Sequence, residues 1–482
     1  MSSFAIARHR TAIRRPQLSR PVRLAVENGF IKQDTSFLDY GCGHGDDIRI
    51  LQHQGIPCYG WDPVYCPEGA RLAADIVNLG YVINVIESID ERIAALKEAW
   101  TLTRCLLIVS ARLNLEAKEE TLTPYADGYL TQIGTFQKCY DQQELRNWID
   151  EILGESSLAI GPGIFFVFRD STLKQSFVAS RFRRKVAAPR EHYSNLLFDK
   201  YKALFEPLME FITSRGCLPD LSELEVVSLI RSEIGSLNHA YKIITQVIGE
   251  EQWNQIREER SQDLLVYLAL SRFGGRPSFS QLPLDLQLDV RAFFSTYKCA
   301  CGLADELLFS TGNSSVIQNA CRRSPVGKLT PDALYIHISA LACLPPALRV
   351  YEGCARNYIG VVEGANIIKL RCGKPQVSYL YYPDFDCDPH PALAAALVVP
   401  LNTFHVHYRE YKDSSNPPIL HRKETFVAPD YPLRTKFQRL TRQEEKYHLY
   451  NDSEIIGTRE GWRKVLQSKG VRLRGHRLLL NG

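Results

Sequence analysis

Hydrophobic runs alternate with amphipathic stretches over the first third of the chain. Apolar runs typical of buried strands cover residues 35–41, 57–63, 74–86 and 105–113, and helical spacing of apolar residues appears at 46–55 and 89–103. Strand and helix signals that alternate in this way predict a parallel sheet with helices on both faces. A helical pattern at 143–153 and an apolar strand at 163–170 would complete this α/β unit.

The pattern changes twice after this unit. Residues 173–189 have the composition of a linker, and the stretches 201–212, 221–230 and 262–273 then show helical spacing. Aromatic and β-branched segments broken by Pro and Gly follow from residue 326 onward. The sequence therefore predicts three domains: a Rossmann-like α/β domain at 1–172, a helical domain at 190–320 and a mixed α+β domain at 326–482.

Composition excludes several classes of protein. Hydrophobic residues make up 45% of 482 residues, which is typical of globular domains, and no stretch has the pattern of a secretory signal or a membrane span. The 13 cysteines lack CxxC spacing, so reduced thiols fit better than a disulfide framework. Cys299 and Cys301 are better explained as buried thiols than as zinc ligands. We expect a cytoplasmic protein without a metal and without membrane contact.

Basic residues are clustered although the net charge is only +4. Two interpretations stay open at this stage: these clusters neutralise the phosphates of a nucleic acid, or they are ordinary solvated surface. The clusters comprise Arg8, Arg10, Arg14, Arg15, Arg20 and Arg23; then Arg181, Arg183, Arg184, Lys185 and Arg190; and finally Arg422, Lys423, Arg434, Lys436, Arg439, Arg472, Arg474 and Arg477.

The strongest chemical signal is a strand that ends in three alternate glycines and opens into a helix. The segment runs from Leu38 to Asp47, with Gly41, Gly43 and Gly45 at the turn. Glycines at such a turn let the backbone approach a ligand closely. A dinucleotide is disfavoured here, because carboxylates at the start of the helix would repel a pyrophosphate. S-adenosylmethionine (SAM) carries an ammonium and a sulfonium instead, so acidic groups suit it.

An acidic residue follows the next strand at the spacing that ribose binding requires. Asp62 lies about 20 residues after the glycine turn, where its carboxylate can accept both ribose hydroxyls, although a simple surface turn before Pro63 is the alternative. SAM is therefore the expected cofactor. The residues expected to bind it are Asp39, Gly41, Cys42, Gly43, Gly45, Asp62 and Asp75.

The third strand signal suggests where the methyl group would be transferred. Asn78, Tyr81 and Asn84 are the catalytic candidates, because the end of this strand lies beside the position where ligands bind in such sheets. A buried Asn78 would equally serve as a hydrogen-bonding structural residue. No general base is evident nearby, but methyl transfer depends mainly on alignment of donor and acceptor.

These motifs resemble a known family. Six segments, 7–25, 38–47, 78–88, 135–140, 378–393 and 416–437, are similar to the methyltransferases associated with DNA phosphorothioation. The resemblance spans almost the whole chain and implies a class I SAM-dependent methyltransferase domain with a family-specific C-terminal part. It also implies DNA and the proteins of the phosphorothioation system as partners. Only the SAM-motif positions Asp39, Gly41, Gly43, Gly45 and Asp62 carry over.

Weaker patterns have a structural interpretation that is favoured over a functional one. The segment Asn416–Ile419 resembles an adenine-binding motif that would need an aromatic residue in place of Ile419. Alternating acidic residues at 384–390 and the pair His405 and His407 lack the further ligands of a metal site. Residues 136–140 either shape an acceptor pocket or pack in the core.

The sequence leaves three functions open. The first is a methyltransferase that transfers methyl from SAM to a nucleic acid. The second is a nucleic-acid-binding accessory protein in which the SAM fold is a scaffold. The third is a methyltransferase of small molecules, which needs no basic surface.

Overall fold

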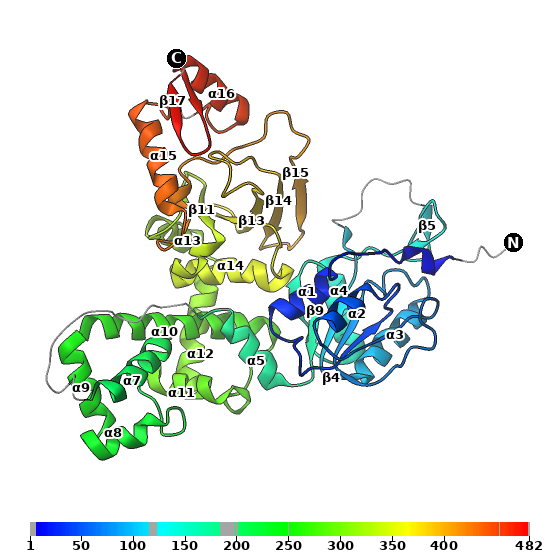
Figure 1. Ribbon diagram of the computed structural model, residues 1–482, viewed down its shortest axis with the longest axis horizontal. Coiled ribbons are helices and arrows are strands. Elements are labelled where there is room, and N and C mark those ends of the chain that lie inside the picture. The colour runs from blue at the N-terminus through cyan, green and yellow to red at the C-terminus, as the bar shows by residue number, and fades with distance from the viewer. Residues whose placement is uncertain are drawn as a thin grey trace.

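The structure is a computed structural model that describes residues 6–114, 123–183, 198, 201–248, 250–452 and 454–480. Of the second basic cluster, Arg184, Lys185 and Arg190 therefore lie outside the described residues. Figure 1 shows an α/β domain at the right, a helical domain at the lower left and a C-terminal domain above them.

The N-terminal domain is built on a six-stranded sheet with the order β2-β1-β3-β4-β9-β8. The strands are β1 (Phe37–Tyr40), β2 (Cys58–Trp61), β3 (Ala74–Gly80), β4 (Thr103–Ser110), β8 (Leu158–Gly161) and β9 (Ile164–Phe168). The first four are parallel, but β9 runs antiparallel to both of its neighbours. The predicted Rossmann-like α/β domain is thus confirmed. The all-parallel sheet is wrong, because only two residues join β8 to β9 and so short a connection can only reverse the chain.

Helices cover both faces of this sheet. Alternate strand residues divide between two cores, one built with α3 (Ile89–Thr101) and α4 (Gln142–Leu153), the other with α1 (Arg20–Glu27), α2 (Asp46–His53) and α5 (Ser171–Ser180). The strand period of two explains the division, since successive side chains point to opposite faces. A small three-stranded sheet, β5 (Thr123–Tyr125), β6 (Gly128–Leu130) and β7 (Phe136–Gln137), is attached beside α3 and was not predicted. Buried Arg92 of α3 holds it through Asp127, at 2.5 Å.

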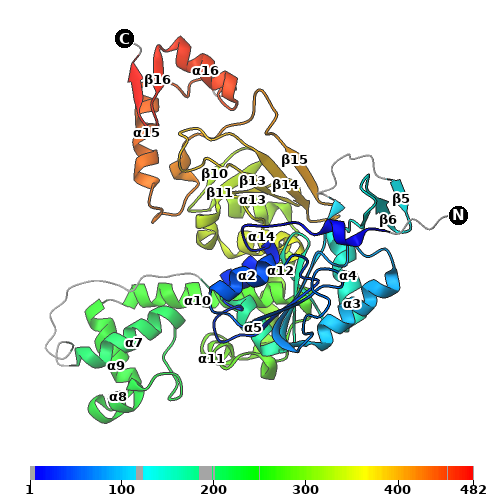
Figure 2. The same cartoon turned by 45° about the vertical axis from the view of Figure 1, so that its right-hand side comes forward.

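The segment 173–189 is not a simple linker, because α5 occupies its first half. Phe177 and Val178 on α5 pack on the sheet, whereas Ala179 joins the core of the helical domain. That domain comprises α7 (Lys202–Arg215), α8 (Val226–Ile234), α9 (Leu237–Ile248), α10 (Glu250–Ser271), α11 (Leu284–Phe293), α12 (Tyr297–Ser310) and α13 (Ser314–Arg322). In both views α7, α8 and α9 form a lobe away from the sheet domain (Figures 1 and 2). The predicted helical middle domain is confirmed.

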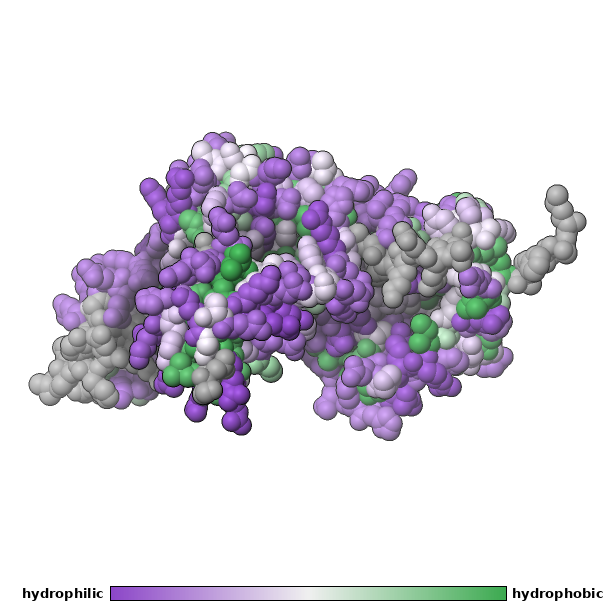
Figure 3. Space-filling model, turned by 90° about the horizontal axis from the view of Figure 1, so that it is seen from above, coloured by the Kyte–Doolittle hydropathy of each residue, from purple (hydrophilic) through white to green (hydrophobic). Residues whose placement is uncertain are grey.

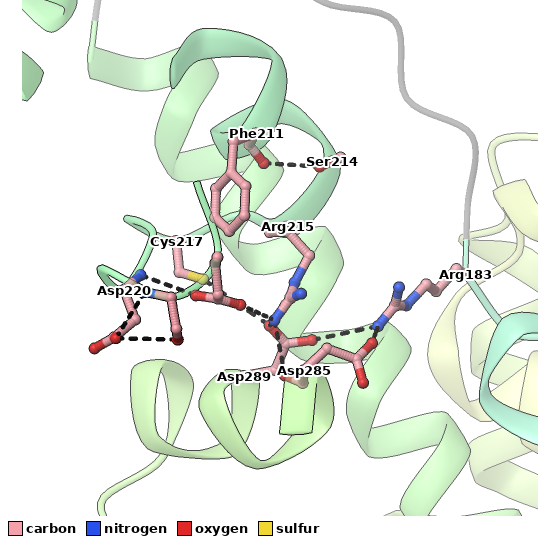
Figure 4. A network of polar contacts seen from close by, with 10 residues as sticks. Arg183, Phe211, Ser214, Arg215, Cys217, Asp220, Asp285 and Asp289 are labelled. Carbon is pink, nitrogen blue, oxygen red and sulfur yellow. Dashed lines mark hydrogen bonds and ion pairs between the residues drawn. The ribbon is translucent and has the colours of Figure 1, made fainter. Parts of the chain in front are cut away.

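An ion-pair network joins this lobe to α11 (Figure 4). The guanidinium of Arg215, at the end of α7, lies 2.7 Å from Asp289 and 3.2 Å from Glu223. Arg183 adds a contact of 2.6 Å to Asp285. Burial raises the pKa of Asp289, so the adjacent guanidinium of Arg215 is what makes a charged carboxylate tolerable there.

The C-terminal domain contains an antiparallel meander with the order β10-β11-β12-β13-β14-β15. Its strands are β10 (Lys328–Leu329), β11 (Ala333–His337), β12 (Ile367–Arg371), β13 (Gln376–Tyr381), β14 (Ala395–Pro400) and β15 (His407–Glu410), and α14 (Pro346–Ile359) covers one face. The last elements are α15 (Arg434–Lys446), α16 (Arg459–Ser468) and the hairpin β16 (Val471–Leu473) and β17 (Leu478–Leu480). This arrangement confirms the predicted mixed α+β domain.

The domains are joined at the end of α14. Val361 donates its backbone N–H to the carbonyl of Ile160 on β8, at 2.7 Å, and Glu363 pairs with Arg20 and Arg23 on α1. These contacts fix the C-terminal sheet against the edge of the N-terminal one. Within the part of the chain described here, no helix is both long and apolar enough to cross a bilayer.

Candidate functional site

A cavity of about 1310 Å³ lies at the carboxyl ends of β1, β2 and β3. This is the edge of a parallel sheet at which α/β proteins bind ligands. Residues from the glycine turn, the end of β2, the turn after β3, helix α3 and the N-terminal segment all line the cavity. Typical ligand pockets measure about 300–1,000 Å³, so this cavity has room for two molecules side by side.

The glycine turn adopts a backbone that other residues disfavour. Gly41, Gly43 and Gly45 have φ angles of +87°, +52° and +71°. At Gly41 a side chain is excluded sterically as well, because a Cβ atom would lie 2.4 Å from Cγ2 of Val82, which lines the cavity. At Gly41 and Gly43 the backbone therefore borders the cavity without a side chain in between, whereas Cys42 and His44 also line it. Of the predicted residues, Gly41, Cys42 and Gly43 line the cavity, whereas Gly45 caps helix α2.

Asp62 lines the cavity and also holds the glycine turn in place. One carboxylate oxygen accepts the backbone N–H of Gly43 at 3.0 Å, and the other accepts those of Val64 and Tyr65 at 2.9 Å. Each oxygen can accept more than one hydrogen bond, so this carboxylate keeps capacity for a hydroxyl donor. The ribose contact of Asp62 stays a prediction, and the three backbone bonds add a structural function that the sequence did not indicate.

Asp39 and Asn78 lie beneath the cavity. Both are buried, and the amide of Asn78 donates to the carboxylate of Asp39 at 2.8 Å. Burial, followed by repulsion from Asp47, raises the pKa of Asp39 to about 7. Neither side chain lines the cavity, so Asn78 has the structural role that was the alternative to catalysis.

Tyr81 and Asn84 come from the turn that follows β3, because the strand ends at Gly80. Tyr81 has a φ of +59°, a strained conformation for an aromatic residue that the bond from its N–H to Ser110 helps to hold. Asn84 is 2% exposed and lines the cavity; its amide donates to Gln137 at 3.2 Å. The side-chain oxygen of Asn84 has no partner among the described residues, which leaves a buried acceptor beside the cavity.

The prediction that Asp75 binds the cofactor is wrong. Asp75 stands at the opposite end of β3, where its carboxylate accepts the backbone N–H and the hydroxyl of Ser36 at 2.9 and 2.7 Å. These bonds hold its pKa below the usual range, and the residue does not line the cavity. A parallel strand several residues long separates its two ends too far for both to reach one ligand.

The sequence did not reveal that the N-terminal segment covers the cavity. Residues 8–13 and Arg15 line it. One end is fixed where Ala7 donates to the carbonyl of Gly134, and Arg8 forms an ion pair of 2.7 Å with Glu87. At mid-length, the Tyr65 hydroxyl donates to the carbonyl of His9.

The carboxylates at the start of α2 fix the other end of this segment. Asp46 accepts the backbone N–H of Arg15 at 2.7 Å, which is the main reason its pKa is lowered, and buried Asp47 accepts that of Ser19 at 2.6 Å. These two carboxylates therefore do not face the cavity. The expectation that they attract the charges of SAM directly is wrong, because backbone N–H groups and Arg15 already satisfy them.

The weaker patterns are explained without ligands. Ile419 is buried between β-bridges of the C-terminal domain, and no residue of 416–419 lines the cavity. A ring nitrogen of His390 lies 2.7 Å from the carboxylate of Glu444. Asp386 accepts a hydrogen bond from the hydroxyl of Tyr431. Across the described ranges, no group of three or more His, Cys, Asp and Glu side chains is arranged to hold a metal. Gln137 lines the cavity, whereas buried Phe136 does not.

Comparison with known proteins gives matches to solved structures alone. No protein-family model matches the chain, and no curated protein matches it. The 1,6-didemethyltoxoflavin-N1-methyltransferase of Burkholderia thailandensis, solved with S-adenosylhomocysteine, is 14% identical, with 34% of this chain and 78% of that chain covered and a TM-score of 0.24. A SAM-dependent methyltransferase from Aquifex aeolicus is 16% identical, with coverages of 31% and 89% and a TM-score of 0.23. CalS10, a SAM-bound amino pentose methyltransferase from Micromonospora echinaspora, is 13% identical, with the same coverages and a TM-score of 0.22.

Proposed function

We propose that this chain is a SAM-dependent methyltransferase that acts on nucleic acid. The observation that carries the proposal is the cavity at the carboxyl edge of the sheet, where the backbone of Gly41 and Gly43 and the carboxylate of Asp62 lie together. Its volume of about 1310 Å³ allows a methyl donor and an acceptor to be held at once.

The chain's residues would divide the work as follows. The backbone at Gly41 and Gly43 allows close approach of the donor, and Asp62 accepts its ribose hydroxyls. SAM supplies an activated methyl carbon: the bond from this carbon to sulfur breaks as the acceptor atom bonds to it, and sulfur keeps the electron pair. The protein has only to align the two molecules and to exclude water.

Asn84 would orient the acceptor. Its buried side-chain oxygen lacks a partner in the described part of the chain, and a buried acceptor left unsatisfied costs about 1–3 kcal/mol. An acceptor molecule that brings an N–H group to this oxygen recovers that free energy. Exocyclic amino groups of nucleobases are N–H donors of this kind, which supports a base as the methylated group.

The nucleic acid is proposed to be DNA. The six segments that resemble the phosphorothioation-associated family support this choice, and that resemblance also makes the proteins of that system the proposed partners. A small-molecule acceptor is the second candidate. It is favoured by one observation: residues 8–13 cover the cavity and restrict the entry of a large substrate.

Calorimetric titration with SAM tests the cofactor site. We expect micromolar binding by the wild-type chain and at least tenfold weaker binding by Asp62→Ala, which is a loss of about 1.4 kcal/mol or more. Asp34→Ala is the matched control, because Asp34 is an exposed carboxylate of the same domain that does not line the cavity. Absence of SAM binding by the wild-type chain would contradict the proposal.

Transfer of a radiolabelled methyl group distinguishes the acceptors. Label incorporated into DNA supports the first candidate, and label found only in small molecules of a cell extract supports the second. Asn84→Ala should reduce transfer while leaving SAM affinity within twofold, since its oxygen is assigned to the acceptor. Equal transfer by this variant and the wild type would refute that role of Asn84.

A further inference from the structure

The last 50 described residues carry an unusual excess of positive charge. Between residues 431 and 480 there are 12 Lys and Arg residues and five Asp and Glu residues, a net charge of +7, whereas the whole chain has only +4. The remainder of the chain is therefore acidic overall. We call the unit of α15, α16 and the β16–β17 hairpin the basic unit; it lies at the end of the molecule opposite the α7–α9 lobe (Figure 1).

All 12 of these cationic side chains are exposed. None of them forms an ion pair with a carboxylate of the described residues. Seen from above, the surface over this end of the molecule is mostly hydrophilic (Figure 3). The cations are Arg434, Lys436, Arg439, Arg442, Lys446, Arg459, Arg463, Lys464, Lys469, Arg472, Arg474 and Arg477.

The N-terminal cluster of arginines differs in this respect, apart from Arg10, which donates to the carbonyl of Ile133 at 3.0 Å. Arg8 pairs with Glu87 and Glu91, Arg14 and Arg15 with the carboxylates at the start of α2, and Arg20 and Arg23 with Glu363. A guanidinium that is paired to a carboxylate has its charge partly neutralised, so it attracts a phosphate less strongly than an unpaired one does. Of the two clusters, the basic unit is the one with its charges free for an external anion.

The cations of the basic unit are arranged on rigid elements. On α15, Arg439, Arg442 and Lys446 are spaced three and four residues apart, so they form one stripe along the helix. On α16, Arg459 and Arg463 are likewise one turn apart. The apolar faces of both helices are buried, with residues such as Phe437 and Trp462 in the cores beneath.

The hairpin presents three more arginines. Arg472 and Arg474 are alternate residues at β16 and its end, so their side chains lie on one face, and Arg477 follows the turn. The turn is closed where Arg474 donates its N–H to the carbonyl of Arg477. The hairpin is fixed to α15, because the N–H of Leu478 donates to the side chain of Gln443 at 3.0 Å.

We infer that the basic unit is a binding surface for the phosphate backbone of duplex DNA. This inference rests on the nucleic-acid part of the proposed function and assigns it to a surface. Eight of the 12 cations are arginines, whose planar fork binds phosphate oxygens in pairs. A helix or a two-stranded ribbon fits the major groove of B-form DNA, and this unit offers both. A membrane surface is a poorer fit, because neither helix has an exposed apolar face to insert.

Fluorescence anisotropy of a labelled 20-base-pair duplex tests the inference on the full chain. The variant is Arg472→Ala/Arg474→Ala/Arg477→Ala, and the matched control removes three exposed cations from α3, α8 and α12, as Lys97→Ala/Arg231→Ala/Lys298→Ala. We expect the hairpin variant to bind at least tenfold more weakly near 100 mM salt. For this variant, the slope of log affinity against log salt should be smaller in magnitude by about two to three, since each phosphate contact contributes about 0.9.

The outcomes separate this inference from the cofactor assignment. Equal losses in the two variants, or no DNA binding by the wild-type chain at low salt, would overturn the binding surface. Retention on anionic vesicles without DNA binding would overturn it in favour of a membrane. SAM titration of the same samples reports the cavity independently, so intact SAM binding beside absent DNA binding refutes the basic unit as a binding surface and DNA as the acceptor, and leaves the proposed cofactor site unaffected.

Discussion

Substitution of one glycine at the cavity separates backbone strain from steric exclusion. Gly41→Ala places a methyl group at a residue with φ of +87° and at 2.4 Å from Cγ2 of Val82. Gly29 provides the matched control, because its φ is +74° and no atom lies within 4 Å of an added Cβ. Both variants carry the same change of residue, but only one of them meets an obstacle.

The magnitudes follow from this comparison. The left-handed conformation costs an alanine about 1–2 kcal/mol at either position. The loss of flexibility in the unfolded chain stabilises both variants by about 0.4–1 kcal/mol, so this contribution cancels. Overpacking against Val82 adds about 1–3 kcal/mol at Gly41 alone. Gly41→Ala should therefore lower the free energy of unfolding by about 1–3 kcal/mol more than Gly29→Ala does.

Urea denaturation measures this difference, and SAM titration gives a second readout. Gly29→Ala should leave SAM affinity unchanged, whereas Gly41→Ala should weaken it, because the displaced Val82 lines the cavity. Adding Val82→Ala to Gly41→Ala should recover much of the loss in excess of that of Gly29→Ala, since the obstacle is removed while the strain stays. Equal destabilisation at Gly41 and Gly29 would refute the steric argument.

Three further substitutions test buried charges. The pKa of Asp39, about 7, lies above its ordinary value of 3.8, so the folded state holds this proton more tightly and loses stability as the pH rises through that interval. The stability of Asp39→Asn relative to the wild type, measured from urea midpoints, should therefore increase as the pH rises from 5 to 8. A difference that stays constant over this range would contradict the argument. Arg215→Met should cost about 3 kcal/mol, measured by urea denaturation, because Asp289 keeps a buried charge without its nearest partner; a loss under about 1 kcal/mol would show the pair to be dispensable. Lys423→Met should cost about 2–4 kcal/mol, since this buried ammonium donates to two backbone carbonyls, while the exposed Lys436→Met should stay within about 0.5 kcal/mol.

The sequence predicted the strands of the N-terminal sheet better than their directions. Apolar runs report burial, and the strands β1, β3, β4 and β9 were all found from them. A run of buried residues has no direction, however, so the antiparallel direction of β9 was not predicted. The short strand β8 beside it was not predicted at all. The residues of β8 form only a four-residue strand, which is too short to show a period.

The candidate site was predicted where local sequence determines geometry. The glycine turn and Asp62 lie within one βαβ unit, and spacing alone brings them together. Asp75 was assigned to the cavity although it stands at the start of β3, and Asn78 although its amide is bonded to buried Asp39. To predict which polar residues lie at the end of a strand, one must know where the strand ends. Strand boundaries are the least reliable part of such predictions.

The two arginine clusters explain why charge in a sequence does not reveal function. Arg8 and Glu87 are 79 residues apart, and Arg23 and Glu363 are 340 apart, so only the fold brings these partners together. In the basic unit the same residue type has no such partners among the residues that the structure describes. Of its five carboxylates, Glu444 is buried against His390, and Glu445 pairs with Arg422 outside the unit. Since a cation bound to an internal carboxylate adds little to long-range attraction, the proposed binding surface would attract a polyanion through the free charges at the C-terminal end. Of the N-terminal arginines, Arg8, Arg10 and Arg15 line the cavity, so their contacts instead hold the segment that borders it.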